Sequence, residues 1–162
     1  MPKTAQLQIR VSARQKAALK RLAAAAGQDV SAYVLGRVLP PARLRFQEIL
    51  RVLARGDDYR FALAELHDLL ATLAPAELAD AVQADDTERL SPFLRNYVAA
   101  MVEECAVAKA VDPPSWTASI PPLDVPYFAT DLPGLRLHLL RASPVTFRRR
   151  NLFVDSTIGA RV

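Results

Sequence analysis

The alternation of apolar and polar residues at positions 5–11 constrains the fold more than any other feature of the sequence. The apolar positions are Leu7, Ile9 and Val11, and the polar positions between them are Gln6, Gln8 and Arg10. A period of two residues is typical of a half-buried strand. A single strand can neither pair its backbone groups nor cover such an apolar face alone, so we expect two copies of the chain to pair here.

Two short helices are predicted directly after this strand. Ser12 is a good N-cap for a helix over about residues 13–26, and Gly27 is a typical C-terminal stop because it adopts the left-handed conformation at little cost. Ser31 is expected to cap a second helix that runs to about Leu39, where two prolines end it.

The order of strand, helix, short turn and helix over residues 5–39 resembles a ribbon-helix-helix DNA-binding domain. The matching segments are the strand LQIRV, the basic first helix and the turn AGQDVSAYV. The resemblance implies an obligate homodimer, in which one strand from each chain pairs and the ribbon enters the major groove of operator DNA.

By position in this resemblance, Gln6, Gln8 and Arg10 match the base-reading residues. Their chemistry agrees, because glutamine can bond to adenine and arginine to guanine in a bidentate manner. Free backbone N–H groups at Ser31, at the start of the second helix, suit a DNA phosphate. Lys16 and Lys20 of the first helix are expected to contact DNA without reading its sequence.

The charge distribution also separates the N-terminal residues from the rest. Residues 1–47 carry nine Lys/Arg against one acid, a net charge of +8, whereas residues 48–110 carry six against twelve, a net charge of −6. Residues 111–162 carry six Arg against four Asp, a net charge of +2. Basic residues can simply solvate helix faces, but so sharp a separation favours a nucleic-acid-binding segment at residues 1–41.

Residues 42–110 are predicted to form a small helical bundle. Leucines recur at helical spacing on both sides of Gly56, and Phe61 is expected to lie on the inner face of the second of these helices. Ser91 and Pro92 form a cap and first-turn pair for a long helix that runs to about Ala110.

Residues 111–162 change character and are predicted to form an extended, proline-rich segment. Seven of the twelve prolines lie here, together with the single Trp. A short helix is expected around residues 135–141. Extended and apolar, the segment should wrap a surface that belongs to its own body, to the dimer mate or to another protein.

Three consecutive arginines beside an apolar run are the most conspicuous feature of this segment. They could bind an acidic groove on a partner, with neighbouring aromatic residues as anchors. The opposite interpretation, a solvated charge cluster next to a core strand, has equal support. The candidate partner-binding residues are Trp116, Phe147, Arg148, Arg149, Arg150 and Phe153.

Catalytic chemistry has no support in the sequence. His67 and His138 lie in separate helical patterns, and Cys105 lies on an apolar helix face without a base partner. We therefore expect no catalytic residues, no metal and no cofactor. The absence of a signal peptide and of a long apolar run, with a single Cys, predicts a cytoplasmic protein that does not cross a membrane.

Two functions fit these expectations. The first is a DNA-binding antitoxin of a bacterial type II toxin–antitoxin module, which represses its own operon and neutralises a cognate toxin with its C-terminal segment. The second is a stand-alone ribbon-helix-helix transcriptional regulator, whose helical body forms an oligomer or senses a ligand. The leucine- and alanine-rich body favours a packed core over a ligand pocket.

Overall fold

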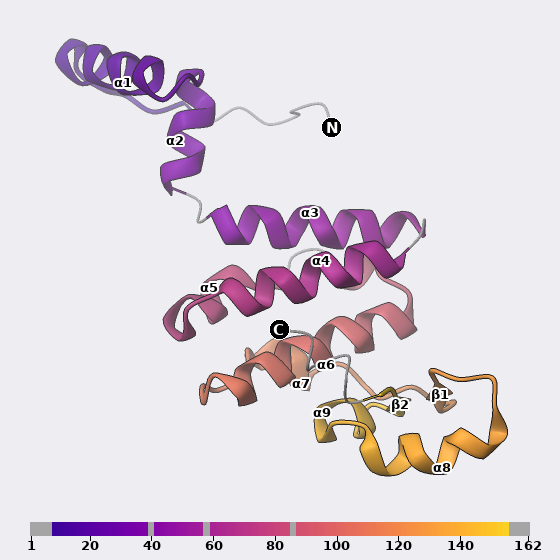
Figure 1. Cartoon of the computed structure of the whole chain (residues 1–162). Helices are drawn as coiled ribbons and strands as arrows, with labels where there is room; N and C mark the ends of the chain where they lie inside the picture. The colour runs from indigo at the N-terminus through magenta and orange to yellow at the C-terminus, as the bar shows by residue number, and fades with distance from the viewer. Residues whose placement is uncertain (1–7, 39–40, 57–58, 85–86, 156–162) are drawn as a thin grey trace. The chain divides into compact units, whose positions relative to one another are not determined.

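The computed structural model of the 162-residue chain describes residues 8–38, 41–56, 59–84 and 87–155. The chain divides into two compact units, Met1–Pro40 and Pro41–Val162. Most of the described residues lie in helices, as Figure 1 shows, so the prediction of a mainly α-helical protein is confirmed.

The N-terminal unit contains the two predicted helices, α1 (Ala13–Ala25) and α2 (Val30–Val38). Residues 8–12 are not in a strand, and residues 5–7 of the predicted strand lie outside the described residues. The two strands of the described chain belong to the other unit, so the ribbon-helix-helix arrangement stays a prediction.

The ends of α1 follow directly from the sequence. The Ser12 hydroxyl accepts a hydrogen bond from the Gln15 backbone N–H, and the Gln15 side chain accepts one from the Ser12 N–H. This reciprocal pair is a capping box. At the other end Gly27 has a φ of +64°, and the Gln28 N–H donates to the Ala23 carbonyl at 3.0 Å. The predicted cap and stop are therefore both confirmed.

The second unit begins with layers of helices that lie side by side in Figure 1. Its first six elements are α3 (Pro41–Arg55), α4 (Tyr59–Thr72), η1 (Pro75–Glu77), α5 (Leu78–Ala81), η2 (Thr87–Arg89) and α6 (Pro92–Ala108). The Ser91 hydroxyl accepts from the Leu94 N–H and Pro92 opens α6, as predicted. These elements form the expected small helical bundle.

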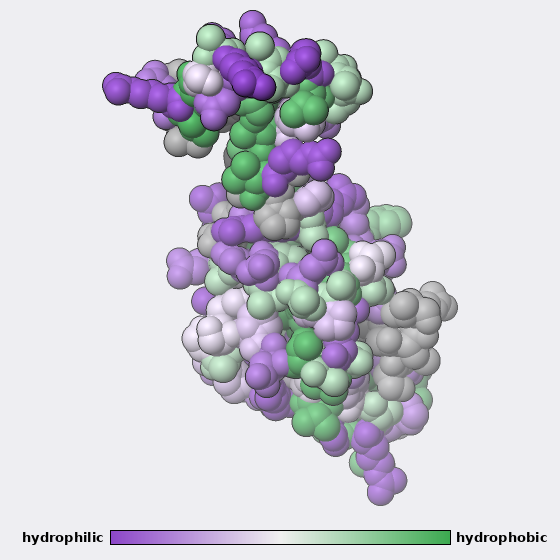
Figure 2. All heavy atoms as spheres, turned by 90° about the vertical axis from the view of Figure 1, so that its left-hand side faces the viewer, coloured by the Kyte–Doolittle hydropathy of each residue, from purple (hydrophilic) through white to green (hydrophobic). Residues whose placement is uncertain are grey.

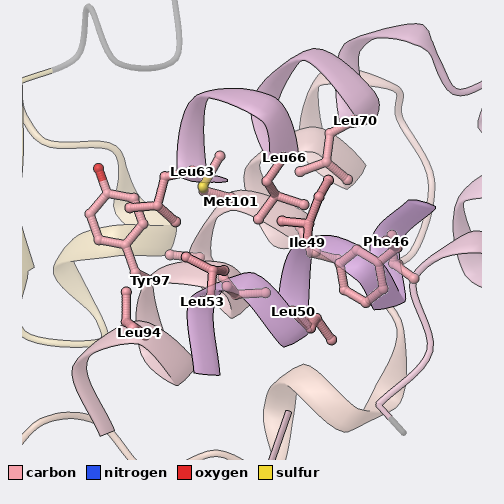
Figure 3. Close-up of a cluster of buried hydrophobic side chains, with 14 of the residues drawn as sticks. Phe46, Ile49, Leu50, Leu53, Leu63, Leu66, Leu70, Leu94, Tyr97 and Met101 are labelled. Atoms are coloured by element: carbon pink, nitrogen blue, oxygen red, sulfur yellow. The ribbon is translucent and has the colours of Figure 1, made fainter. Parts of the chain in front are cut away.

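Leucines from α3 and α4 meet the apolar face of α6 in the core. Figure 3 shows this cluster, which includes Phe46, Ile49, Leu50, Leu53, Leu63, Leu66, Leu70, Leu94, Tyr97 and Met101. The prediction that Phe61 lies inside is wrong, because its side chain is 78% exposed. Its neighbours Ala62 and Leu63 are buried instead.

The C-terminal part of the chain is folded onto the bundle. Its elements are α7 (Ser115–Ala118), β1 (Tyr127–Phe128), α8 (Pro133–Ala142), α9 (Val145–Arg148) and β2 (Leu152–Phe153), with β1 and β2 paired in parallel. Leu152 and Val154 are part of the same core as α3 and α4. Of the three surfaces that residues 111–162 were expected to wrap, the described residues 111–155 cover their own body, because their apolar side chains complete the bundle core.

A buried ion pair joins this C-terminal part to α6. Arg150 is 4% exposed, and its Nη2 and Nε donate to the two Glu103 carboxylate oxygens at 2.6 and 3.2 Å. Nη2 also donates to the Thr117 carbonyl at 2.6 Å, and Nη1 lies 3.2 Å from Asn96 Oδ1 and 3.5 Å from the Ile120 carbonyl. The guanidinium thus has acceptors in every direction that its N–H groups point.

The neighbours of this pair fix the chain on both sides of Arg150. Asn96 is itself held by its Nδ2, which donates to the Pro92 and Pro121 carbonyls. Asn151 adopts a φ of 58°, and its Nδ2 donates to the Leu123 carbonyl at 2.6 Å. Asparagine tolerates this left-handed conformation better than most residues, so it suits the turn between α9 and β2.

We expect Glu103→Gln to destabilise the second unit by about 3–5 kcal/mol, because it leaves the Arg150 cation buried without a counter-charge. Urea unfolding of the full chain measures this. Glu48→Gln is the control, since Glu48 pairs with Arg51 at an exposed site where a pair contributes at most about 1 kcal/mol. An equal loss of unfolding free energy in the two variants would contradict the stabilising role of the buried Glu103–Arg150 pair.

The same ion pair makes the free energy of unfolding depend on pH. Burial alone would raise the pKa of Glu103, but hydrogen bonds from Arg150 and Arg149 outweigh it and hold the pKa below its ordinary value of 4.5. A lowered carboxyl pKa stabilises the folded state fully above pH 4.5, and this contribution is lost as the pH falls through the folded-state value. The free energy of unfolding of the wild-type chain should therefore approach that of Glu103→Gln as the pH falls below about 4.5.

Candidate functional site

The N-terminal unit exposes most of its apolar side chains. Among residues 8–35 and 37–38, Ala23 alone is buried. The large apolar side chains that stay exposed are Ile9, Val11, Leu22, Val30, Leu35 and Val38. In Figure 2, hydrophobic side chains of this unit lie at the surface beside strongly hydrophilic ones.

A unit of this kind lacks the core that would make it stable alone. Burial of a Val, Leu or Ile side chain stabilises by about 1.5–3 kcal/mol, and six such side chains are exposed here. Folded units of fewer than about 40 residues usually depend on disulfides, metals or oligomerisation. The only cysteine of the chain, Cys105, lies in the second unit, which excludes a disulfide within the first.

Five of the six predicted DNA-binding residues have exposed polar side chains in this unit, Ser31 at the start of α2 among them. Gln8 and Arg10 precede α1, and Lys16 and Lys20 lie four residues apart on α1, which places them on one helix face. Gln6 lies outside the described residues. The side chains needed for DNA contact are thus accessible on the segment that also exposes the apolar residues.

The start of α2 differs from the prediction for Ser31. The residue that caps this helix is Asp29, whose Oδ1 accepts hydrogen bonds from the Ser31 and Ala32 N–H groups at 2.8 and 3.0 Å. The expectation that these N–H groups are free for a phosphate is therefore wrong, because a carboxylate occupies them. Aspartate and serine are about equally good N-caps, so the sequence alone does not decide whether Asp29 or Ser31 caps α2.

Four of the six predicted partner-binding residues are held inside the second unit. Phe147 and Arg150 are buried, Phe153 is buried and stacked on Phe128 at 4.8 Å between ring centroids, and Trp116 Nε1 donates to the Val82 carbonyl at 2.8 Å. In the single chain these side chains fix the C-terminal part to its own body, so partner contact through them stays a prediction.

The other two residues of that set are exposed. Arg148 lies at the surface, and Arg149 Nη2 contacts Glu103 Oε1 at 2.6 Å from a half-exposed position. Several large apolar side chains of this region are also exposed. They belong to α8 and its flanks, namely Leu132, Leu135, Leu137, Leu140 and Val145, and their exposed area is called the α8 surface below.

The second unit also contains a cavity of about 510 Å³, which the sequence did not predict. Its walls come from α4, α6 and the β1 region and include Tyr59, Leu63, Phe93, Tyr97, Met101 and Tyr127. No local motif joins these residues. The available signal was composition, since three of the four tyrosines of the chain meet here.

Aromatic rings dominate this cavity. The Phe93 ring lies 5.9, 5.7 and 4.5 Å from the rings of Tyr59, Tyr97 and Tyr127, measured between centroids. Burial, together with the two neighbouring phenols, raises the pKa of Tyr97 to about 12. Burial and the Tyr59 phenol also raise the pKa of Tyr127. The hydroxyl groups therefore stay protonated and can donate hydrogen bonds at neutral pH.

Comparison of the chain with family models, curated proteins and solved structures found no match. None of the described helices has the length and apolar character to cross a bilayer. Within the described ranges, no group of three or more His, Cys, Asp or Glu side chains is arranged to hold a metal ion.

We expect Asp29→Ala to lower the amide-exchange protection of α2 about fivefold, because loss of a helix cap costs about 1 kcal/mol. Amide hydrogen exchange on the full chain, followed by NMR, measures it. Ser31→Ala is the matched control and should leave protection unchanged, since the cap is the Asp29 carboxylate. A larger effect of Ser31→Ala than of Asp29→Ala would contradict this capping arrangement.

Proposed function

We propose that the chain is a cytoplasmic, homodimeric repressor that binds operator DNA through a ribbon-helix-helix formed by its N-terminal unit. The observation that carries this proposal is the combination of a basic surface and exposed apolar residues on a unit with almost no core. A second copy of the unit supplies the missing apolar contacts, which makes dimerisation and folding of the unit one event.

Pairing of the two N-terminal strands explains both faces of residues 5–11. Ile9 and Val11 are exposed in the single chain, and they are the residues that a paired ribbon buries. Gln6, Gln8 and Arg10 then face the major groove, while Lys16 and Lys20 of α1 strengthen binding to any DNA.

We further propose that this repressor is the antitoxin of a type II module. The C-terminal part completes the body core in the single chain, which leaves its exposed side chains for contact with a toxin. We place the toxin contact on the α8 surface. Five large apolar side chains are exposed on this helix and its flanks, and Arg136, Arg141 and Arg148 are exposed in the same stretch of chain. Exposed apolar residues together with arginine are typical of protein interfaces.

The alternative function, a stand-alone regulator with a ligand-sensing body, is favoured by the aromatic cavity. Its volume lies within the range of small-molecule sites, and three phenol groups line it. Both functions share the DNA-binding unit, and they differ in what the second unit binds.

We expect Arg10→Ala to weaken binding to the chain's own operator at least tenfold while changing binding to random DNA little, because loss of a base contact costs about 1–3 kcal/mol of discrimination. Lys16→Ala and Lys20→Ala are the comparison variants. They should weaken binding to both DNAs similarly and reduce its salt dependence. Fluorescence anisotropy at several salt concentrations measures both effects. An equal loss on operator and random DNA with Arg10→Ala would refute base reading by this residue.

For the antitoxin function, the product of the adjoining gene in the same operon should stop growth when expressed alone, and co-expression of this chain should restore growth. Leu137→Glu places a charge in the α8 surface and should abolish the rescue. Val107→Glu, at an equally exposed apolar position on α6, should keep it. A harmless adjoining gene product would exclude the antitoxin function and leave DNA binding unaffected.

A further inference from the structure

The aromatic cavity has the size and composition of a binding site for one small molecule. It measures about 510 Å³ and lies within the second unit, between α4, α6 and the β1 region. Its walls are mainly apolar, with Leu63 and Met101 beside the four aromatic rings. A few polar groups in a largely apolar cavity are characteristic of ligand sites.

The arrangement of the rings favours a planar ligand. Phe93 meets Tyr59 edge to face at 73°, and its planes with Tyr97 and Tyr127 are tilted by 56° and 53°. Rings at such angles present both edges and faces to the cavity. An aromatic guest can therefore stack on one wall while it meets another edge-on, which are the two arrangements that aromatic pairs prefer.

One polar group in this cavity has no protein partner. The Tyr97 side chain is 8% exposed, lines the cavity, and makes no hydrogen bond to any residue in the described part of the chain. Figure 3 shows its hydroxyl at the outer edge of the leucine cluster, pointing away from those side chains. This hydroxyl is open to the cavity, since Arg95 Nε is the fully buried polar side-chain atom that lacks a partner in the described part of the chain. A ligand in the cavity that accepts a hydrogen bond from the phenol can therefore gain affinity.

The charges around the cavity do not favour an ion. Arg60 and Asp68 contribute opposite formal charges to the lining, and the third polar side chain outside the tyrosines is His67. The Tyr97 ring packs against the apolar rings of Phe93 and Phe147. Transfer of a full charge into such surroundings is costly without a counter-charge, whereas a neutral acceptor needs only the phenol groups.

We propose that this cavity binds an uncharged, planar aromatic molecule that carries a hydrogen-bond acceptor, with the Tyr97 hydroxyl as its donor. This inference deepens the ligand-sensing alternative by naming the class of ligand. It rests on the second unit alone and is tested without DNA. Failure of DNA binding and failure of this site are therefore distinguishable.

Benzamide is a suitable probe, because it is planar and uncharged and has a carbonyl acceptor. Titration of the isotope-labelled full chain, followed by NMR, should give saturable shifts for residues around the cavity with a Kd of about 1 mM or tighter. Cyclohexanecarboxamide has the same polar group on a non-planar ring, and benzoate has the same ring with a negative charge. Both should bind at least about tenfold more weakly.

Tyr97→Phe removes only the hydroxyl and keeps the ring, and it should weaken benzamide binding about tenfold. Tyr33→Phe, in the N-terminal unit, is the matched control and should bind like the wild-type chain. If Tyr97→Phe fails to fold, Tyr127→Phe replaces it with the same expected direction. Absence of saturable binding, unchanged binding in the Tyr97 variant, or equal affinity for either comparison compound would each overturn the proposal.

Discussion

The second unit depends on one buried ion pair. Glu103 belongs to the middle of α6, and Arg150 follows α9, so the pair joins the bundle to the last part of the chain. A buried pair stabilises little relative to an apolar pair of the same shape, but loss of either member leaves an uncompensated charge. The pair therefore fixes one register of the C-terminal elements, since any other leaves Arg150 without its five acceptors.

The two units differ in how much of their apolar surface they bury. The second unit brings leucines from α3, α4 and α6 together with Leu152 and Val154, and so covers most of its apolar surface within one chain. The first unit has too few residues for this and leaves residues such as Ile9 and Val38 exposed. This contrast is the physical basis for proposing that the first unit acts as a dimer, while the second offers a surface and a cavity to other molecules.

Local features of the sequence predicted local structure well. Ser12, Gly27 and Ser91 have the expected roles at helix ends, because capping depends on a few neighbouring residues. The C-terminal part could not be predicted in this way. Arg148 and Arg150 are equivalent in sequence pattern, yet one is exposed and the other is buried against a residue 47 positions away. The cavity was missed for the same reason, since its tyrosines come from three separate elements.

The distance along the chain between Glu103 and Arg150 also affects the order of folding during synthesis. The caps of α1 and the turn after it involve residues that are close in sequence, so this unit can form its helices early. The core of the second unit includes both Phe46 and Val154, and it is incomplete until the ribosome has made the latter. The α3 and α4 leucines lack some of their final neighbours while more than eighty further residues are made, which makes this nascent segment a natural client for chaperones.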